Sequence, residues 1–529
     1  MKIIVEQIKT SINTKDETIF EIARARTEET RAFSNISNPS IYKRSIDARH
    51  NSDIRFVSSV IFDCEGISQG YDLIKLDKYQ IKVLDEFSFD FKKDYIRPDK
   101  PPVIVGFGPC GMFCALILAR AGFRPIVIER GSDIEKRISD VNNFKTNQIL
   151  NENSNVQFGA GGAGTFSDGK LTTRINDKKC SFILKSFVEF GAPYDILTKA
   201  KPHIGTDKLV NIVKNIDSEI RSLGGNILYD TTFLSNDDKF VYTTKGKHEF
   251  SSLILAIGNS SRDTYDYLLK SGYSIEPKPF SVGVRVEHLQ SDLNRALYGD
   301  FSDDKRLGQA EYNVSYRKNG RGVYSFCMCP GGEVICAASE SESVVVNGMS
   351  NYKRDKVNAN SAIAVQVDRE DYGSNPYKAI EFQRSIEKKS FVLGGSNYYA
   401  PVQTLGDFYG NKLTREPQRI IPSYMNGKYK LADINSLFPT FVCEYLKMGF
   451  YEFGKKIKGF DKKDVPITAP ETRTSSPVRI LRDNETLSAL GKCNIYPCGE
   501  GAGYAGGIMS SSIDGLNVAL SILKKCERK

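Results

Sequence analysis

Two short apolar runs, joined by a glycine-rich turn and an apolar helical stretch, dominate the hydrophobic pattern of the chain. The first run, Val103–Val105, leads through the turn into an apolar stretch that continues to Ala121. The second run is Ile126–Ile128, and an acidic residue, Glu129, closes it. Runs this short and uninterrupted are typical of strands buried on both faces of a parallel sheet. The pattern therefore predicts strand, turn, helix and strand, which is the start of an α/β fold.

The glycines of this turn have the spacing of a dinucleotide-binding motif. Gly106 permits a tight turn, Gly108 lets the backbone approach a pyrophosphate, and Gly111 lets the helix pack closely on the strand. The helix N-terminus offers unpaired N–H groups and the positive end of its dipole to phosphates. Glu129 follows roughly 20 residues later, where a carboxylate accepts hydrogen bonds from an adenosine ribose. The expected dinucleotide-binding residues here are Gly106, Gly108, Pro109, Cys110, Gly111, Glu129 and Arg130.

The first 97 residues have the pattern of a separate, small α+β unit. Met1–Ile8 and Ile54–Phe62 have the composition of strands, and Asp16–Arg31 predicts a helix. Clustered prolines in Arg97–Pro102 then stop any regular element and stiffen a linker. Lys43–Arg49 is either a functional patch or a solvated segment whose charges pair with one another. Basic and acidic residues nearly balance in this unit, which argues against an RNA-binding module.

A second glycine-rich segment, Gly159–Lys170, follows the dinucleotide motif without a clear strand before it. So many glycines let a backbone lie against a flat or anionic ligand. We therefore expect this segment to wrap the same cofactor, with Gly162, Gly164 and Thr165 among the residues that contact it. The alternative is a flexible surface loop.

Two further elements are predicted after this segment. Lys208–Leu223 has the periodicity of a helix, with Thr206 and Asp207 as candidate caps. The apolar run Leu253–Asn259 predicts a buried strand, and Gly258 is expected to turn the chain beside the cofactor.

From about residue 271 to residue 482 the pattern changes to alternating strands, which predicts a sheet-rich substrate domain inserted into the nucleotide-binding fold. Cys327 and Cys329 share one side of a strand by the period-two rule, so both are candidate thiol donors to the cofactor; ordinary core cysteines are the alternative. Arg285 and Arg473 either orient a substrate carboxylate or pair with acids of the domain. His203 is either a general acid–base or a structural hydrogen-bonding residue.

A short strand, a Gly–acid pair and a glycine-rich helix start recur together near residue 500. The stretch Asn494–Ile508 contains them, and Met509–Leu523 predicts the helix. A carboxylate here suits ribityl hydroxyls, and a helix N-terminus stabilises negative charge that develops on a reduced ring system. The expected residues of this second half-site are Gly499, Glu500, Gly506, Gly507 and Ile508.

Composition narrows the class of protein. The length of 529 residues exceeds one ordinary core, so two or three domains are expected. The net charge of +9 is small for this length and no long Lys/Arg block occurs, so a nucleic-acid partner is not expected. The eleven cysteines lack disulfide-framework or zinc spacing, which favours a reducing, cytoplasmic compartment and no metal site. No apolar stretch has the length and continuity of a signal core or a membrane span.

Motifs across most of the chain resemble a bacterial family usually called uncharacterised FAD-dependent dehydrogenases. That family lies among the oxidoreductases with a glutathione-reductase or monooxygenase type of FAD-binding Rossmann domain. The resemblance implies FAD, with Gly258 near the cofactor and Gly499 and Glu500 on the ribityl chain, where many flavoproteins carry Asp in place of Glu500. It implies no particular substrate. The motifs are Lys43–Arg49, Phe158–Lys170, Lys201–Thr206, Tyr324–Gly332, Asn347–Ser350, Glu471–Pro477 and Gly499–Gly507.

We therefore predict an α/β fold with three parts. Residues 98–270 and 483–529 form an FAD-binding Rossmann-like domain, residues 271–482 an inserted sheet-rich α+β substrate domain, and residues 1–97 a small N-terminal α+β domain. The predicted function is an FAD-dependent oxidoreductase that transfers hydride between flavin and a small organic substrate. Two alternatives are a flavin-containing tRNA-modification or partner-binding protein and an FAD-dependent monooxygenase.

The electron donor is left open by the sequence. The cysteine pair that disulfide reductases carry after the ribose-binding acid is absent from Gly159–Lys170. A second full dinucleotide fingerprint is also missing, so tightly held NAD(P) is not expected. NAD(P)H as a transient donor and direct reduction by a substrate are both compatible with this pattern.

Overall fold

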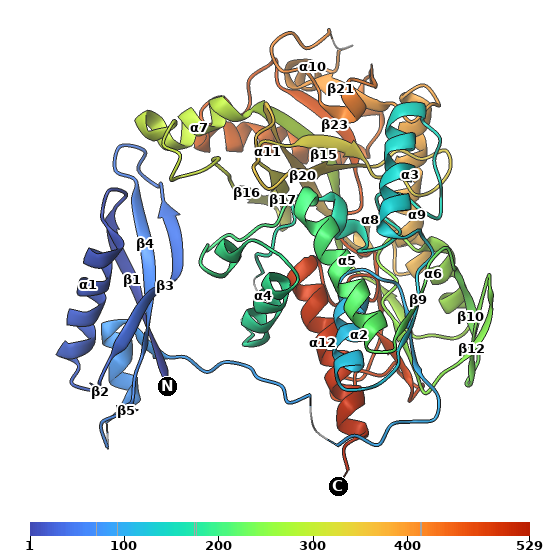
Figure 1. Ribbon diagram of the computed structural model, residues 1–529. Helices are drawn as coiled ribbons and strands as arrows, with labels where there is room; N and C mark the ends of the chain where they lie inside the picture. The colour runs from blue at the N-terminus through green and yellow to red at the C-terminus, as the bar shows by residue number, and fades with distance from the viewer. Residues whose placement is uncertain (70, 92–93, 174, 176, 413–414, 529) are drawn as a thin grey trace.

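Among the residues that the structure describes, a five-stranded parallel sheet forms the centre of the larger body (Figure 1). This computed structural model describes residues 1–69, 71–91, 94–173, 175, 177–412 and 415–528. The strand order is β25-β13-β7-β8-β9, and each neighbouring pair is parallel. The strands are β7 (Pro102–Val105), β8 (Ile126–Ile128), β9 (Asn226–Leu228), β13 (Ser252–Leu255) and β25 (Ile495–Pro497).

Both faces of this sheet are covered because its strands are apolar on both sides. Ile104 lies in a core with the helices α2 (Pro109–Arg120), α5 (Thr206–Ser222) and α12 (Ile508–Lys525), whose close packing Figure 1 shows. Val103 and Val105 lie in a second core with α6 (Arg262–Lys270) and β11 (Phe240–Thr243). A parallel sheet covered in this way is the expected Rossmann-like arrangement, so the predicted fold class is confirmed.

A mixed sheet of seven strands, counted over the described residues, forms a second layer in the order β16-β17-β20-β15-β23-β21-β22. Its central strands, β15 (Phe280–Leu289) and β20 (Asn358–Val367), are antiparallel and buried along almost their whole length. The helix α11 (Thr440–Lys456) packs on them. The other strands are β16 (Ser315–Lys318), β17 (Arg321–Cys329), β21 (Ala400–Thr404), β22 (Tyr429–Leu431) and β23 (Pro466–Glu471).

The chain passes between the two sheets through an antiparallel pair, β14 (Ile275–Pro277) and β24 (Val478–Ile480). The segments that lead into and out of the sheet-rich part predicted after residue 271 therefore lie side by side. Smaller elements surround both sheets. They include α3 (Ile134–Asn147), α4 (Lys179–Glu189), α7 (Gln290–Tyr298), α9 (Pro376–Leu393), β10 (Phe233–Asn236), β12 (Gly246–Glu249), β18 (Glu333–Cys336) and β19 (Val346–Met349).

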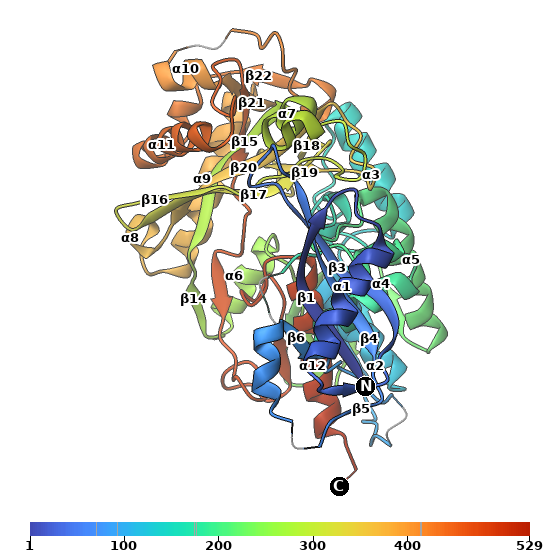
Figure 2. The same cartoon turned by 90° about the vertical axis from the view of Figure 1, so that its left-hand side faces the viewer.

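The N-terminal unit contains a four-stranded antiparallel sheet, within the described residues, with the helix α1 against it (Figure 2). The helix α1 (Asp16–Glu29) contacts the sheet through Ile19 and Ala23, as an amphipathic helix does. The two predicted strands and the predicted helix are confirmed. The strands, in the order β3-β4-β1-β6, are β1 (Lys2–Ser11), β3 (Ser37–Asp47), β4 (Arg55–Asp63) and β6 (Ile81–Val83).

The outer strand β3 joins this unit to the larger body. Arg44 donates its backbone N–H to the carbonyl of Thr198 at 2.7 Å and accepts from the N–H of Ala200 at 2.9 Å. Side chains in the same segment are paired within the unit, Arg44 with Asp16 and Arg49 with Asp47, both at 2.6 Å. The pairing favours the interpretation of residues 43–49 as a salt-bridged segment.

One local prediction about α5 is wrong. The helix begins at Thr206 with Gly205 as its N-cap, and no side chain caps it. Thr206 instead donates its hydroxyl to the Thr165 carbonyl at 2.7 Å, and Asp207 accepts from the N–H of Tyr352 at 2.7 Å. Both polar side chains therefore tie neighbouring loops together, a use that a local sequence pattern does not reveal. Within the described residues, no helix combines the length and apolar character needed to cross a bilayer.

Candidate functional site

The carboxyl ends of β7, β8 and β13 open onto one elongated cavity. Ligands bind at this edge of parallel α/β sheets. The cavity holds about 1790 Å³ of empty space, part of it open to solvent. Most of its walls come from residues within 105–110, 157–170, 256–261 and 500–511. The rest come partly from β17 and β23 of the seven-stranded sheet and from β19. The two predicted halves of the dinucleotide site therefore share one groove.

Two long helices direct their N-termini into this cavity. Pro109 begins α2 and Ile508 begins α12, both residues line the cavity, and no side chain caps either helix. Their first-turn N–H groups and dipoles are therefore available to a ligand with negative charge. Gly515 permits this arrangement, because a Cβ there would lie 2.1 Å from the carbonyl oxygen of Cys110. Sequence reasoning missed Gly515, since a glycine inside a helix carries no distinctive signal.

The glycines of the first turn meet steric demands that other residues cannot meet. Gly106 has a φ of +101°, and a Cβ there would lie 2.3 Å from the carbonyl oxygen of Ala256. A Cβ on Gly111 would lie 2.0 Å from the carbonyl oxygen of Gly106. A Cβ on Gly162 would lie 2.8 Å from the Gly108 Cα, so the second glycine-rich segment packs against the first. This contact contradicts the flexible-loop alternative for residues 159–170.

Arg137 of α3 holds the second glycine-rich segment in place. The side chain is fully buried, and burial lowers its pKa to about 10, so the guanidinium stays protonated at neutral pH. It donates hydrogen bonds of 2.6–3.3 Å to the carbonyl oxygens of Asn155, Val156, Gly159, Ala160 and Gly162. Sequence reasoning missed this residue, because an arginine on a polar helix usually indicates a solvated face.

Glu129 joins three backbone segments beside the first glycine turn. Its carboxylate accepts from the N–H groups of Phe107 at 2.8 Å and of Gly131 and Gly159 at 2.9 Å. A carboxylate has about four acceptor positions, so about one remains for a ligand. Glu129 and its neighbour Arg130 both line the cavity, which agrees with the predicted contact to a ribose.

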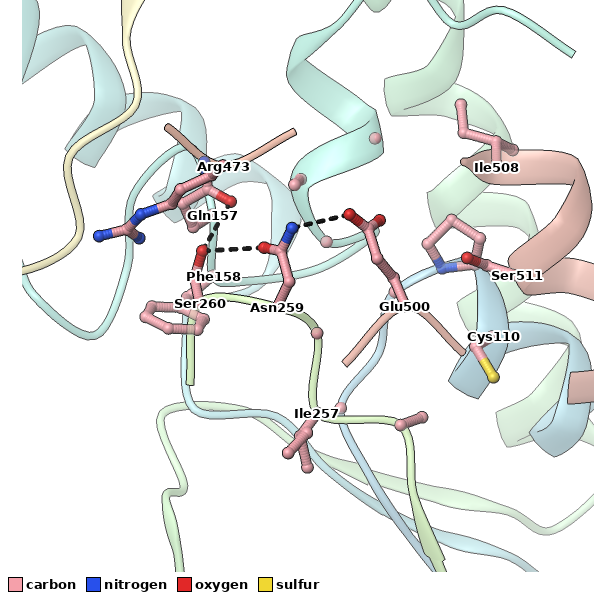
Figure 3. A pocket seen from close by; sticks show the side chains of 18 of the residues that line it. Cys110, Gln157, Phe158, Ile257, Asn259, Ser260, Arg473, Glu500, Ile508 and Ser511 are labelled. Carbon is pink, nitrogen blue, oxygen red and sulfur yellow. Dashed lines mark hydrogen bonds between the residues drawn. The ribbon is translucent and has the colours of Figure 1, made fainter. Parts of the chain in front are cut away.

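A chain of polar side chains crosses the cavity wall, as Figure 3 shows. The Ser260 hydroxyl lies 3.0 Å from Gln157 Oε1 and 3.2 Å from Asn259 Oδ1, and the Asn259 amide donates to Glu500 at 2.7 Å. Burial raises the pKa of Glu500 to about 7, against the opposing charge of Lys278. Among the described residues, Asn259 is the one hydrogen-bond donor to this carboxyl group, which leaves capacity for a ligand hydroxyl. The sequence pattern indicated only Glu500 of this group.

The two candidate substrate-binding arginines are both held by acids. Arg285 is fully buried and pairs with Glu471 at 2.9 Å. Arg473 lines the cavity and pairs with Glu387 at 2.9 Å. Burial opposes ionisation of Glu387, but Arg473 prevails and holds its pKa at about 2. Of the two interpretations, the geometry favours ion pairing within the domain.

The remaining predicted residues divide into those that line the cavity and those behind its wall. His203 lies behind the wall, where its Nε2 is 3.0 Å from the Tyr352 carbonyl oxygen and burial lowers its pKa, as expected of a structural histidine. The predicted residues outside the lining are Gly111, Thr165, His203, Cys329 and Gly499. The predicted residues that line it are Gly106, Gly108, Pro109, Cys110, Glu129, Arg130, Gly162, Gly164, Gly258, Cys327, Arg473, Glu500, Gly506, Gly507 and Ile508.

Gly499 acts from behind the wall through its backbone. Its N–H donates to Asp514 of α12 at 2.7 Å, and Asp514 also pairs with Arg482 at 2.7 Å. This contact fixes the turn that carries Glu500, and sequence reasoning missed both partners. No group of three or more potential metal ligands occurs in the described part of the chain.

These features together fit an elongated dinucleotide with a polar sugar chain. Gly106, Gly108 and Gly162 line the cavity beside the N-terminus of α2 without side chains, which suits the close approach of a diphosphate. Glu129 and Glu500 supply acceptors on either side of it. Apolar side chains form much of the lining, and the carboxylates, amides and backbone N–H groups among them suit hydroxyls and phosphates.

Comparison with known proteins shows the family. Residues 279–474 match the model of a family described as FAD-dependent protein, C-terminal domain-like. A protein of Clostridium beijerinckii, described as uncharacterised, is 46% identical over 502 residues, which is 93% of each chain. The chain therefore belongs to the family of FAD-dependent proteins that its motifs indicate.

Solved structures resemble the chain only distantly. Glycine oxidase from Geobacillus kaustophilus and L-proline dehydrogenase from P. horikoshii each match 81% of this chain and 95% of their own. Their sequence identities are 10% and 12%, and both TM-scores are 0.35. Likenesses of this size carry no information on the substrate.

Proposed function

We propose that this protein is an FAD-dependent oxidoreductase that transfers hydride between flavin and a small organic substrate. The observation that carries the proposal is the single groove that joins the glycine turn at residues 106–110 to the N-terminus of α12. Membership of an FAD-dependent family supports FAD as the occupant. When bound, FAD supplies two-electron redox chemistry.

Different side chains and helix N-termini hold different parts of this cofactor. Gly108 and the N-terminus of α2 receive the diphosphate, and Glu129 receives the adenosine ribose. Glu500 receives a ribityl hydroxyl, and its protonation near neutral pH lets it either donate or accept. The N-terminus of α12 then stabilises negative charge that develops beside it.

The substrate is expected at the end of the cavity that the seven-stranded sheet closes. Phe326, Cys327 and Asn347 form that wall together with Arg473. The ion pair with Glu387 keeps the Arg473 guanidinium charged and fixes its position in this wall. A small molecule fits this enclosed end better than a macromolecule does.

The partner and compartment proposals rest on charge and on cysteine chemistry. Arg44 and Arg49 are paired with acids, which weighs against a nucleic-acid surface on the N-terminal unit. Each of the eleven cysteines, all within the described residues, is a free thiol, which supports a reducing cytoplasmic location.

Anaerobic reduction tests the function directly. The purified protein is expected to be yellow, and its flavin absorbance is expected to bleach with NADH, NADPH or a member of a metabolite panel. A holoprotein that none of these donors reduces contradicts the catalytic proposal. A preparation that does not bind added FAD contradicts the cofactor assignment as well. Oxygen consumption coupled to substrate hydroxylation would assign the monooxygenase class instead.

A further inference from the structure

The strand β17 breaks its alternation at Cys327. Its pairing with β20 shifts register between Phe326 and Cys329, and Cys327 has a φ of +44°, in the left-handed region. This bulge overturns the period-two expectation that Cys327 and Cys329 present equally to the cavity. Cys327 lines the cavity, whereas Cys329 is fully buried directly behind it. Non-glycine residues in this conformation cluster at functional sites.

The bulge brings the two thiols together. The Cys329 thiol donates to the Cys327 carbonyl oxygen at 3.4 Å, so the two cysteines are in direct contact. Residues two apart in a regular strand are held farther from one another, because the extended backbone separates them. Cys329 is therefore reached from the cavity through Cys327.

Positive charge at the bulge favours a thiolate on the exposed member of the pair. The Arg285 guanidinium lies 3.2 Å from the Cys327 carbonyl oxygen and 4.0 Å from the Cys329 sulfur. The hydrogen bond from Cys329, followed by Arg285 and Lys170, lowers the pKa of Cys327 to about 6 against the effect of burial. The hydrogen bond to Cys327 and burial raise the pKa of Cys329. One thiolate beside one thiol is the arrangement of a reactive dithiol.

We propose that Cys327 and Cys329 form a redox-active pair that exchanges two electrons with the bound flavin, and that the substrates are thiols and disulfides. This inference rests on the proposed function, because it needs FAD in the cavity. In the oxidising direction, one S–S bond forms between the two sulfurs. The two electrons and two protons that the thiols lose reduce the flavin by one two-electron equivalent.

Reaction with a substrate disulfide balances in the same way. The Cys327 thiolate attacks one substrate sulfur, which breaks the substrate S–S bond and releases one thiolate. Cys329 then attacks the Cys327 sulfur, releases the second substrate thiol, and closes the protein disulfide. Reduced flavin then supplies two electrons that, with two protons, break the protein disulfide and regenerate both thiols, and the flavin returns to the oxidised form.

A second close pair of cysteines does not serve this role. Cys110 and Cys498 have sulfurs 3.1 Å apart, but both are buried, and a mutual hydrogen bond and burial raise the pKa of Cys110. They lie at the start of α2, at the diphosphate end of the cavity. The raised pKa keeps Cys110 a thiol, and the pair lies away from the substrate wall.

Anaerobic reductive titration of the purified holoprotein tests the proposal. The wild type is expected to take up about two two-electron equivalents of dithionite per flavin before bleaching is complete. Cys329→Ser and Cys327→Ser are each expected to take up about one. Cys443→Ser, which changes a buried cysteine of α11 outside the cavity, is the matched control and keeps about two.

Alkylation followed by mass spectrometry gives a readout independent of turnover. In the oxidised holoprotein, unfolded without reductant, Cys327 and Cys329 are expected to resist alkylation, and after anaerobic reduction both are expected to react. Cystamine, a small disulfide, is then expected to reoxidise the reduced wild type but neither serine variant. If cystamine and glutathione disulfide both fail, the substrate class is wrong.

The failures of the two proposals are distinguishable. A yellow wild-type protein that takes up one equivalent and alkylates both cysteines as isolated overturns the redox pair and leaves the flavin assignment intact. A protein that holds no FAD after incubation with the cofactor overturns the proposed function, and the pair with it. If Cys329→Ser does not fold, Cys327→Ser at the cavity surface decides the outcome.

Discussion

The two ends of the cavity are built by different means. At the diphosphate end, backbone atoms make the site, and glycines at positions 106, 108 and 162 allow those atoms to approach one another. At the substrate end, side chains make the site, and buried ion pairs such as Arg285–Glu471 hold them. The glycines of the first turn, 106, 108 and 111, lie close together in the sequence, whereas Arg285 and Glu471 are 186 residues apart.

This difference predicts different consequences of mutation. A change at the backbone-built end is expected to remove the cofactor, because nothing else supplies the N–H groups. A change at the side-chain-built end is expected to reduce stability or alter reactivity while the cofactor stays bound. The following tests address that contrast in order of decreasing effect.

Replacing Arg137 by Met is expected to have the largest effect. The variant loses donors to five buried carbonyl groups of the segment that packs on the first turn. We expect the free energy of unfolding to fall by about 4 kcal/mol and FAD retention to be lost. Urea unfolding and the flavin content of the purified protein measure both. Arg55→Met, at an exposed pair with Asp53, is the control and should change stability by less than about 1 kcal/mol.

Replacing Glu471 by Gln tests the other end. The substitution leaves the buried Arg285 without its carboxylate, and we expect a loss of about 3 kcal/mol of unfolding free energy. FAD retention should remain, since the glycine turn is untouched. A variant of normal stability would show that the pair does not hold the substrate wall. Asp53→Asn is the matched control at a solvent-exposed pair.

Glu500 should make stability depend on pH. Because burial raises its pKa from 4.5 to about 7, the contribution of the protonated carboxyl is fully present below pH 4.5 and is lost as the pH rises through about 7. We expect the unfolding free energy to drop by about 3 kcal/mol across this range, and Glu500→Gln to remove that drop. Urea unfolding at several pH values measures it. An unchanged pH profile in the variant would contradict the assignment.

The smallest effect is expected at His203. His203→Phe removes one hydrogen bond to the Tyr352 carbonyl and keeps the packing of the ring, so stability should fall by about 1 kcal/mol. The pH dependence of flavin reduction should not change, because the imidazole lies behind the cavity wall. Loss of one limb of that pH profile would instead make His203 a general acid or base.

The sequence predicted the strand, glycine turn and helix at residues 102–120 correctly because their physical requirements are local. Gly106, Gly108 and Gly111 lie within one turn and carry a distinctive spacing. Of the polar chain from Gln157 to Glu500, the sequence indicated only Glu500. Ser260 and Asn259 escaped prediction because their contacts form only when the fold brings three segments together. The prediction that Cys327 and Cys329 face the same side of a regular strand is wrong, because no local sequence pattern indicates the bulge.

The two halves of the cavity are also far apart in the sequence, so the complete site can form only after the C-terminal half has been synthesised. Cys110 and Cys498, whose sulfurs touch beneath the groove, are 388 residues apart, and β25 enters the central sheet beside a strand made long before it. A ribosome must therefore complete both halves before any cofactor can be retained. Flavin absorbance in a fresh extract would therefore report only full-length chains. Fragments truncated before residue 495 would bind no flavin and stay colourless, even if they fold.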